Sequence, residues 1–426
     1  MTSGDSLATS QRSLGDPEVR HPLWPPLVAG CPTTSTDAIA HPLEVDYAYD
    51  RASTALFTGP GPGTGPGNSA GHDRWAPLLP PLLAPGLGEG GTPLIDLGNG
   101  VFVKDESRNP TWSHKDRLNR VTVSAAVGVG ASGTVVASSG NHGASAAAYA
   151  ARAGLRCVVL ASADMPPAVA SFLNAYGAVV LPVPAAERWP LMRLIVDRIG
   201  LHPVSNLTVT HTGHPFGAEG YKTVAYEIFA DLGVPSAVFV PTGYGELLFG
   251  VWKGFTELRR LGLAESVPRI YACEPELGGP LHAALRQGVP AARVDVGKSD
   301  AYGIDCPVGS IRGVLAVRGS GGDALLVSDK QMRAAQAELA GQGLWVELSA
   351  AAGLAGLRST EKTEAKTPEN TAENAAGRAE REGPVVCIST SSGFKDRGVG
   401  APELAVPVDP SWDEVYRRLR AAGIHD

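Results

Sequence analysis

The sequence has no run of about 18 uninterrupted apolar residues, and its first twenty residues contain no apolar core like that of a signal peptide. It also has no excess of basic residues, because 36 Lys and Arg face 43 Asp and Glu and leave a formal net charge of -7. A nucleic-acid-binding surface normally requires a basic excess. We therefore expect a cytoplasmic protein that binds neither membranes nor nucleic acid.

Spacings typical of metal ligands are also absent. The cysteines occur singly, with no C-x-x-C pair and no histidine at zinc-finger distance. This pattern predicts buried free thiols in a reducing compartment, and no metal site. The five cysteines are Cys31, Cys157, Cys273, Cys306 and Cys387.

Glycine and proline, by contrast, are abundant, with 52 Gly and 34 Pro. Many of them lie in "FTGPGPGTGPGNSAGHD", residues 57–73, which we predict to be a flexible loop after an N-terminal extension of residues 1–56. Residues 359–382 contain no Val, Ile, Leu or aromatic residue. Because such a segment cannot offset its ordering entropy by burial, we predict a disordered insertion there, with a helical excursion that is polar on all sides as the alternative.

The rest of the chain alternates short apolar runs with Ala-rich helical patterns, which predicts an α/β fold with mostly parallel sheets covered by helices. In the first half we expect strands over 100–106, 133–140, 155–162 and 178–183, and helices over 115–130, 142–154 and 166–177. In the second half we expect strands over 236–243, 269–275 and 384–390, and helices over 220–233, 246–262, 329–343 and 349–359.

Two of the predicted strand-to-helix junctions are small and polar: "ASSGNHGAS", residues 137–145, and "PTGYGELLFG", residues 241–250. The N-terminus of a helix offers unpaired N–H groups and the positive end of the dipole, which suits a carboxylate or a phosphate. An N-cap with a glycine turn and an ordinary turn between strand and helix are the alternatives.

Lys115, in "NPTWSHKDR", begins a predicted helix near these junctions. A lysine in that position is usually a solvated surface charge. A lysine amine and a separate phosphate-sized anion site are, however, the two requirements for holding pyridoxal phosphate as a Schiff base.

Four motifs in this order, "KDESRNPTWSHKDR", "SSGNHGASAAAYAARAG", "VPTGYGELLFGVWKGF" and "STSSGFKD", resemble the fold-type II pyridoxal-phosphate enzymes, and threonine synthases in particular. The resemblance extends from about residue 40 to about residue 400. It implies a large domain of residues 74–124 and 211–426, a small domain of residues 125–210, the cofactor in the cleft between them, and a homodimer.

The resemblance also implies roles for individual residues. Lys115 matches the catalytic lysine that anchors the cofactor. The cofactor-binding positions are Lys115, Asn141, Thr242, Gly243, Tyr244, Gly245, Glu246, Leu247 and Thr390. The positions that bind the substrate's α-carboxylate are Ser138, Ser139, Asn141 and His142.

Near Lys115 and in the phosphate loop, three residues depart from the threonine synthase pattern. Trp112 replaces a glycine, and we expect it to narrow or wall the cleft. His114 replaces an aromatic residue, and we interpret it as a packed ring with an outward nitrogen, an acid-base role being the alternative. Glu246 replaces a glycine of the phosphate loop, and we expect it to face outward or to act as an acid in the first helical turn.

Further departures affect the expected substrate. Gly217 occupies the position of an arginine that contacts the substrate's phosphate in the family. His211 and His214 are either partial replacements or loop histidines that cap backbone groups. Ser391 and Ser392 replace Gly and His, whereas Glu347 and Ser349 keep residues that we expect to brace the wall of the site.

The resemblance therefore implies a lyase acting on a small amino acid. Because Thr390 offers a neutral hydroxyl to the pyridine nitrogen, elimination is favoured over transamination. The leading reaction is γ-elimination of phosphate from O-phosphohomoserine, followed by water addition to give threonine. Alternatives are β-elimination or β-replacement on another amino acid, as in a serine or threonine dehydratase, a diaminopropionate ammonia-lyase or a cysteine synthase-like enzyme, and a non-catalytic binding protein.

Overall fold

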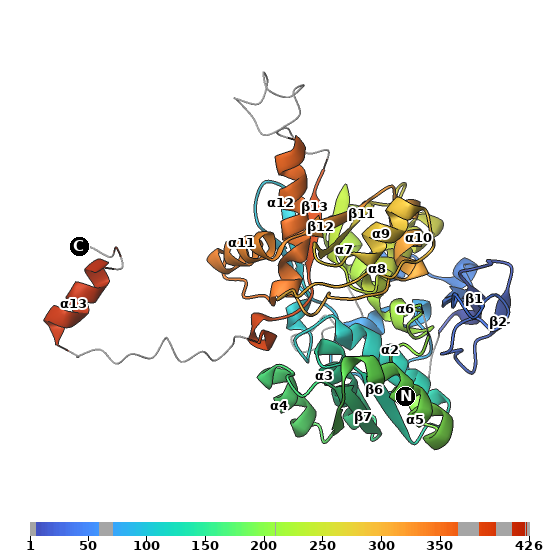
Figure 1. Cartoon of the computed structure of the whole chain (residues 1–426). Coiled ribbons are helices and arrows are strands. Elements are labelled where there is room, and N and C mark those ends of the chain that lie inside the picture. Colours follow the sequence, from blue (N-terminus) through green and yellow to red (C-terminus); the bar gives the residue numbers. More distant parts are fainter. Residues whose placement is uncertain are drawn as a thin grey trace.

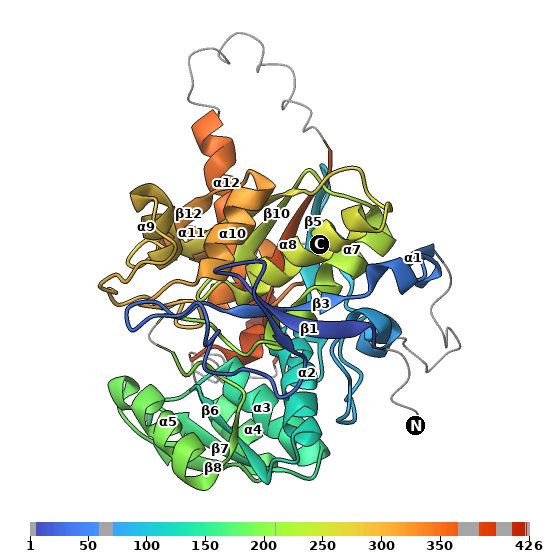
Figure 2. The same ribbon diagram turned by 90° about the vertical axis from the view of Figure 1, so that its right-hand side faces the viewer.

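Two mostly parallel sheets and their helices dominate the structure (Figure 1, Figure 2). A computed structural model describes residues 6–58, 71–208, 210–364, 383–397, 411–421 and 423. The predicted α/β fold class is confirmed, because one sheet has four strands, the other has six, and parallel pairs dominate both. The domain limits given above stay a prediction.

The four-stranded sheet has the order β8-β7-β6-β9, and every pair in it is parallel. Its central strands are apolar and buried, as a sheet covered by helices on both faces requires. In Figure 1, α4 and α5 flank this sheet. The elements are β6 (Gly133–Ala137), α3 (Asn141–Arg152), β7 (Arg156–Ala161), α4 (Pro167–Ala175), β8 (Val179–Pro182), α5 (Arg188–Ile199) and β9 (His202–Pro203).

The six-stranded sheet has the order β12-β11-β10-β13-β5-β4, and only the edge strand β4 is antiparallel. Segments far apart in the sequence meet in it, because β13 near the C-terminus pairs with both β10 and β5. The strands are β4 (Leu94–Asp96), β5 (Val101–Asp105), β10 (Ala237–Pro241), β11 (Arg269–Pro275), β12 (Ala324–Val327) and β13 (Val385–Ser389).

Eight α-helices of the described residues accompany this sheet. Tight interhelical packing explains two glycines, since a side chain at Gly250 would meet Tyr221 at 2.5 Å and one at Gly254 would meet the Lys222 carbonyl at 2.5 Å. The helices are α2 (Lys115–Gly128), α6 (Gly217–Tyr221), α7 (Thr223–Leu232), α8 (Glu246–Arg260), α9 (Pro280–Gln287), α10 (Ile311–Ser320), α11 (Asp329–Gly341) and α12 (Ala352–Glu364).

The N-terminal extension forms a three-stranded antiparallel sheet, β2-β1-β3, that docks on the helices of the larger sheet. Lys253 of α8 donates to the carbonyl of Val45 at 2.7 Å, and the Tyr47 hydroxyl donates to Glu219 of α6 at 3.0 Å. The strands are β1 (Ala8–Ser13), β2 (Arg20–Pro22) and β3 (Leu43–Tyr47).

Two predicted loops are only partly covered by the described residues. Residues 59–70 of the predicted 57–73 loop lie outside them, while Phe57 and Thr58 end α1 (Ala55–Thr58) and His72 begins a 3-10 helix. The prediction of disorder is wrong for residues 359–364, because they form the end of α12 (Ala352–Glu364). The first half of this helix is rich in alanine and leucine. Residues 365–382 lie outside the described residues.

All five cysteines are buried free thiols, as predicted. Within the described ranges, no helix combines the length and the apolar character that crossing a bilayer requires. The remaining elements are α13 (Trp412–Ala421) and the 3-10 helices Tyr49–Arg51, His72–Leu78, Glu106–Arg108, Ala185–Glu187, Leu348–Ala351 and Gly393–Lys395.

Candidate active site

A cavity of about 440 Å³ lies where strands of both parallel sheets end. It is lined by the segments that follow β6, β10 and β13, and by the start of α2. Carboxyl ends of parallel strands are the usual place for a binding site in such folds. Every residue predicted for the site lines it: Lys115, Ser138, Ser139, Asn141, His142, Thr242, Gly243, Tyr244, Gly245, Glu246, Leu247 and Thr390.

Lys115 is the first residue of α2, and its Nζ donates a hydrogen bond of 3.0 Å to the Tyr221 hydroxyl. Burial lowers the pKa of Lys115, although Glu246 and Cys306 oppose this shift. A lowered pKa increases the fraction of neutral, nucleophilic amine. Tyr221 lies in a segment whose residue pattern predicts only a helix, so no sequence signal marked it as a site residue.

His114, next to Lys115, is a packed ring, but its nitrogen does not point outward. Nδ1 lies 3.1 Å from the Thr390 carbonyl, and the ring centroid is 5.4 Å from that of Tyr221. Burial and the nearby Lys115 hold the pKa of His114 well below its usual value. A neutral imidazole therefore links the lysine segment to the Thr390 loop.

At one end of the cavity α3 begins with Asn141, and no side chain caps the helix. The Asn141 amide donates to Glu347 at 2.7 Å and accepts from the Ser391 hydroxyl at 3.2 Å. Burial lowers the pKa of His142 to about 3, so its ring is neutral, and its Nε2 has no hydrogen-bond partner among the described residues. Free amides and neutral donors thus face the cavity here.

At the other end α8 begins with Glu246, again without a side-chain cap. Gly245 has a φ of 81°, a left-handed conformation that favours glycine. A side chain at Gly243 would lie 2.8 Å from the Cys306 sulfur, so this position requires glycine as well. These two glycines bring the backbone amides at the start of α8 to the cavity surface.

Of the two placements expected for Glu246, the outward one is wrong, whereas Glu246 is an acid in the first turn of α8. Its side chain is only 9% exposed, and its Oε1 has no hydrogen-bond partner among the described residues. The carboxyl lies against Gly213 and Gly217, where a side chain at Gly213 would collide with it. It fills the space that these two glycines leave. Burial raises the pKa of Glu246, against the attraction of Arg312 and Lys115.

The loop after β13 braces the lysine segment. Thr390 is buried, and its carbonyl accepts from the His114 amide at 3.0 Å. Ser391 donates to the Trp112 carbonyl at 3.1 Å, and its own carbonyl accepts from the Glu347 amide at 3.0 Å. The expectation that Glu347 braces the wall is met through its contact with Asn141.

Trp112 does not narrow the cavity, contrary to our expectation. It is absent from the lining, 41% exposed, and packed edge-on against Phe172 of α4 at a centroid distance of 5.2 Å. Its φ of 62° lies in the left-handed region, which strains a bulky residue. The glycine that the family pattern has at this position would suit that conformation.

The two histidines near Gly217 have different surroundings. The His211 ring stacks on Tyr244 at 4.0 Å, and both residues line the cavity. The Nδ1 of His214 accepts from the Phe216 amide at 3.0 Å, which is the capping interpretation. Gly217 itself begins α6 and is not among the lining residues.

A buried ion network that no sequence pattern indicated lies under the lysine segment. Arg117 Nε lies 2.7 Å from Glu106, its Nη1 lies 2.6 Å from Glu227, and Lys104 Nζ lies 2.8 Å from Glu227. The Arg117 cation holds the pKa values of both glutamates below their ordinary value despite burial. Four paired charges thus fix the first turn of α2.

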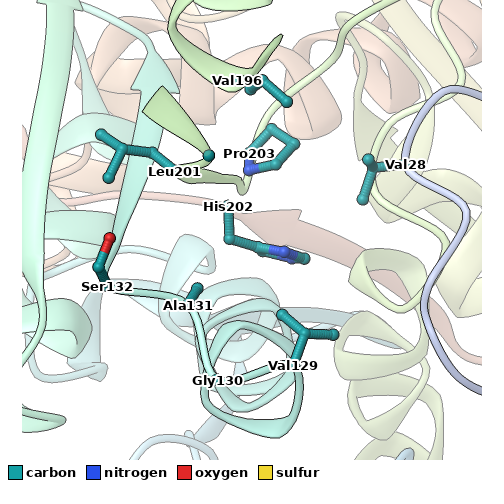
Figure 3. A pocket seen from close by; sticks show the side chains of 10 residues that line it. Val28, Val129, Gly130, Ala131, Ser132, Val196, Leu201, His202 and Pro203 are labelled. Atoms are coloured by element: carbon teal, nitrogen blue, oxygen red, sulfur yellow. The ribbon is translucent and has the colours of Figure 1, made fainter. Parts of the chain in front are cut away.

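A second hollow lies between the N-terminal extension, the end of α2 and the end of α5 (Figure 3). Its lining is mostly apolar, and Figure 3 shows His202 at its centre. The Nε2 atom of His202 lies 3.0 Å from that of His214. No residue predicted for the site lines this hollow.

The first cavity fits the cofactor that the sequence resemblance implies. The Lys115 amine opens into it, and the uncapped amides of α8 offer a phosphate site beside Gly245. Gly245 packs on Gly313, and the adjacent Arg312 is fully buried with Nε and Nη1 unpaired among the described residues. Unsatisfied buried donors in that place suit an anion.

Comparison with known proteins points in the same direction. The family described as "Pyridoxal-phosphate dependent enzyme" matches residues 86–377. A threonine synthase of Methanosarcina acetivorans is 32% identical over 72% of this chain and 76% of that protein, and one of Halalkalibacterium halodurans is 33% identical over 73% and 84%. The solved threonine deaminase isoform 2 of Solanum lycopersicum shares the fold with a TM-score of 0.58 at 18% identity, over 78% and 84%.

Proposed function

This chain belongs to the family of pyridoxal-phosphate-dependent enzymes, and from this premise we propose that its cavity eliminates a group from a small L-amino acid, with Lys115 as cofactor anchor and proton-transfer base. One observation carries the proposal. Lys115 is half-buried and presents an amine of lowered pKa to a cavity that is also lined by the uncapped N-termini of α3 and α8.

Pyridoxal phosphate, when bound, acidifies the α-hydrogen of an amino acid by delocalising the charge that the departing proton leaves. The residues that would hold it are Lys115, the amides at the start of α8, Asn141 beside the ring, and Thr390 at the ring nitrogen. Thr390 supplies no negative charge, which favours departure of a leaving group over reprotonation.

Lys115 removes the α-proton with Nζ and returns a proton later in the cycle. The Tyr221 hydroxyl, 3.0 Å from Nζ, orients the amine. Burial raises the pKa of Tyr221 well above its usual value, so the hydroxyl stays protonated and adds no charge beside the base. Burial and the nearby Lys115 hold the pKa of His114 well below its usual value, so its imidazole is a weak base and Lys115 is the stronger base at this point of the cavity.

The start of α3 binds the α-carboxylate of the substrate. Its uncapped amides and the hydroxyl of Ser138 supply donors, and the positive end of the helix dipole favours the anion. The Ser139 hydroxyl accepts from the Ser162 amide at 2.6 Å, which holds the loop in place. Binding here fixes the Cα–H bond relative to Lys115.

The first candidate reaction is the one that names the curated relatives: phosphate leaves the γ carbon of O-phosphohomoserine, water adds at the β carbon, and threonine forms. Gly217 offers no cation to the departing phosphate. Arg188 at the start of α5 lines the cavity with a buried Nε that lacks a partner in the described residues, and it supplies that charge.

Purified protein given O-phosphohomoserine should release inorganic phosphate and threonine in equal amounts. The Lys115→Ala variant should release neither, and Arg188→Met should raise KM more than it lowers kcat. If wild-type protein forms no threonine while it still exchanges the α-hydrogen of other amino acids, this reaction is refuted and the lyase assignment is retained.

A second candidate is β-elimination or β-replacement on another amino acid, such as serine, threonine, diaminopropionate or an O-activated serine. The observation that favours it is the acidic Glu246 beside Gly217, in a region where the relatives place an arginine. A panel of these amino acids, assayed for α-keto acid and ammonia, separates the two candidates. Turnover of serine or threonine, with no phosphate released from O-phosphohomoserine, would favour the second candidate reaction.

A further inference from the structure

Glu246 is the one acidic side chain at the start of α8, the helix whose first amides line the cavity. The helix has 15 residues, so its N-terminus carries a full dipole. The Glu246 carboxyl is more than nine-tenths buried, and its Oε1 has no hydrogen-bond partner among the described residues. A buried polar atom without a partner usually has an absent ligand or water as its partner.

The groups that face Glu246 come from four segments, and none of them forms a hydrogen bond to it. Lys115 of α2 and Arg312 of α10 attract the carboxylate, and Glu246 in turn raises the pKa of the Tyr221 phenol in α6. His211 Nε2 lies 4.0 Å from Oε2, and burial holds the pKa of that ring well below its usual value. No neighbouring side chain therefore satisfies the carboxyl.

A phosphate at the amides of α8 adds close to two negative charges near this carboxyl. A carboxylate there would repel the phosphate. A protonated carboxyl would instead donate a hydrogen bond to a phosphate oxygen, a strong type of hydrogen bond. Burial already raises the pKa of Glu246, and the bound phosphate would raise it further.

We propose that Glu246 is a ligand of the cofactor's phosphate, which it binds as a neutral carboxyl that donates a hydrogen bond, so that cofactor binding takes up one proton from solvent. This inference rests on the proposed placement of the phosphate at α8. It assigns to Glu246 a role that the glycine of the family pattern could not have. It also predicts that cofactor affinity falls as the pH rises.

The test is cofactor titration of full-length protein from which the cofactor has been stripped, followed by absorbance from pH 6 to pH 9. Wild type is compared with Glu246→Gln, whose amide is neutral and donates at every pH. The ratio of the two dissociation constants cancels the titration of Lys115 and of the cofactor itself. We expect wild-type binding to weaken relative to Glu246→Gln as the pH rises from 6 to 9, by about tenfold for each pH unit above the pKa of the unbound carboxyl, because that group loses its protonated form tenfold per unit.

Glu274→Gln is the matched control, because Glu274 is a buried acid whose pKa burial raises to about 7 but which does not line the cavity. The ratio of the cofactor dissociation constants of Glu274→Gln and wild type should not change with pH. Calorimetry in two buffers of different ionisation enthalpy should show about one proton more taken up by wild type than by Glu246→Gln. Circular dichroism checks that each variant is folded.

Two results would overturn the inference. One is a wild-type to Glu246→Gln ratio that is constant from pH 6 to pH 9. The other is that Glu246→Gly binds the cofactor more tightly than wild type and Glu246→Gln do at every pH. That result would mean that the carboxyl obstructs cofactor binding. Failure of wild type to bind the cofactor through Lys115 would overturn the proposed site itself, and this inference with it.

Discussion

The two ends of the cavity have the same backbone arrangement but differ in the hydrogen bonding of the first helical side chain. Both α3 and α8 follow a parallel strand, and both begin without a side-chain cap. At the α3 end the first residue is Asn141, whose amide is satisfied by Glu347 and Ser391. At the α8 end the first residue is Glu246, whose Oε1 has no partner among the described residues. The first side chain of α3 is therefore fixed by other side chains of the protein, whereas we propose that the first side chain of α8 finds its partner in a bound ligand.

Lys115 stands between these ends, so its replacement should have the largest effect. We expect Lys115→Ala to lower lyase activity by at least about 10³-fold, because it removes the covalent anchor and the base together. The measurement is single-turnover activity with saturating cofactor. A control variant, Lys298→Ala, removes a lysine that is not among the cavity-lining residues and should keep full activity.

The ion network under the lysine segment should have the next largest effect, on the free energy of unfolding. Removing Arg117 leaves Glu106 without its buried cation and Glu227 with Lys104 alone, so Arg117→Met should lower the free energy of unfolding by about 3–5 kcal/mol. Urea unfolding at pH 7 measures this. The exposed pair Arg286–Asp323 is the control, and Arg286→Met should cost less than about 1 kcal/mol.

The same network predicts a pH dependence. The pKa values of Glu106 and Glu227 are lower in the folded protein than the ordinary glutamate value. Their stabilisation is therefore complete above that ordinary value, about 4.3, and is lost as the pH falls through the folded values. Wild type should lose stability below about pH 4 more steeply than Arg117→Met does. Parallel curves for the two proteins would contradict this.

The arrangement of the cavity was largely predictable from residue patterns, because glycine-bearing turns after apolar strands place polar groups at one edge of a sheet. Side-chain directions were not. Glu246 does not face outward, because Gly213 and Gly217, remote in sequence, leave a space that the Glu246 carboxyl fills. Trp112 was expected in the cleft, but its positive φ turns the ring onto Phe172.

Side-chain contacts between segments far apart in the sequence could not be predicted from residue patterns either. Tyr221 contacts Lys115 across 106 positions, and Arg117 meets Glu227 across 110. The helix α5 was not predicted, since its start at Arg188 is followed by Trp189 and a proline at position 190. The short strand β12 was missed for lack of length.

An intermediate effect is expected at the α3 end. Asn141→Ala should lower activity by about 10- to 100-fold and shift the absorption maximum of the bound cofactor, since the amide lies beside the ring in the proposed site. Glu347→Gln should shift the maximum in the same direction, because Glu347 orients Asn141. A variant pair that shifts it in opposite directions would separate the two residues.

The smallest effect is expected at Trp112. Trp112→Gly relieves a positive φ that costs about 1 kcal/mol or more, but it loses ring contacts of about 0.5–1.5 kcal/mol. The free energy of unfolding should change by less than about 1 kcal/mol. Phe172→Leu loses the same contact without relieving strain, so it should destabilise the protein more than Trp112→Gly. The reverse order in urea unfolding would contradict this assignment.

The most direct test of the account is to reduce the cofactor-loaded protein with borohydride and to locate the modified lysine by peptide mass mapping. Lys395 is the informative rival, because it is also buried and its pKa is lowered to about 8. The account predicts a single modified lysine, Lys115. Label on Lys395, or no label on any lysine, would contradict it.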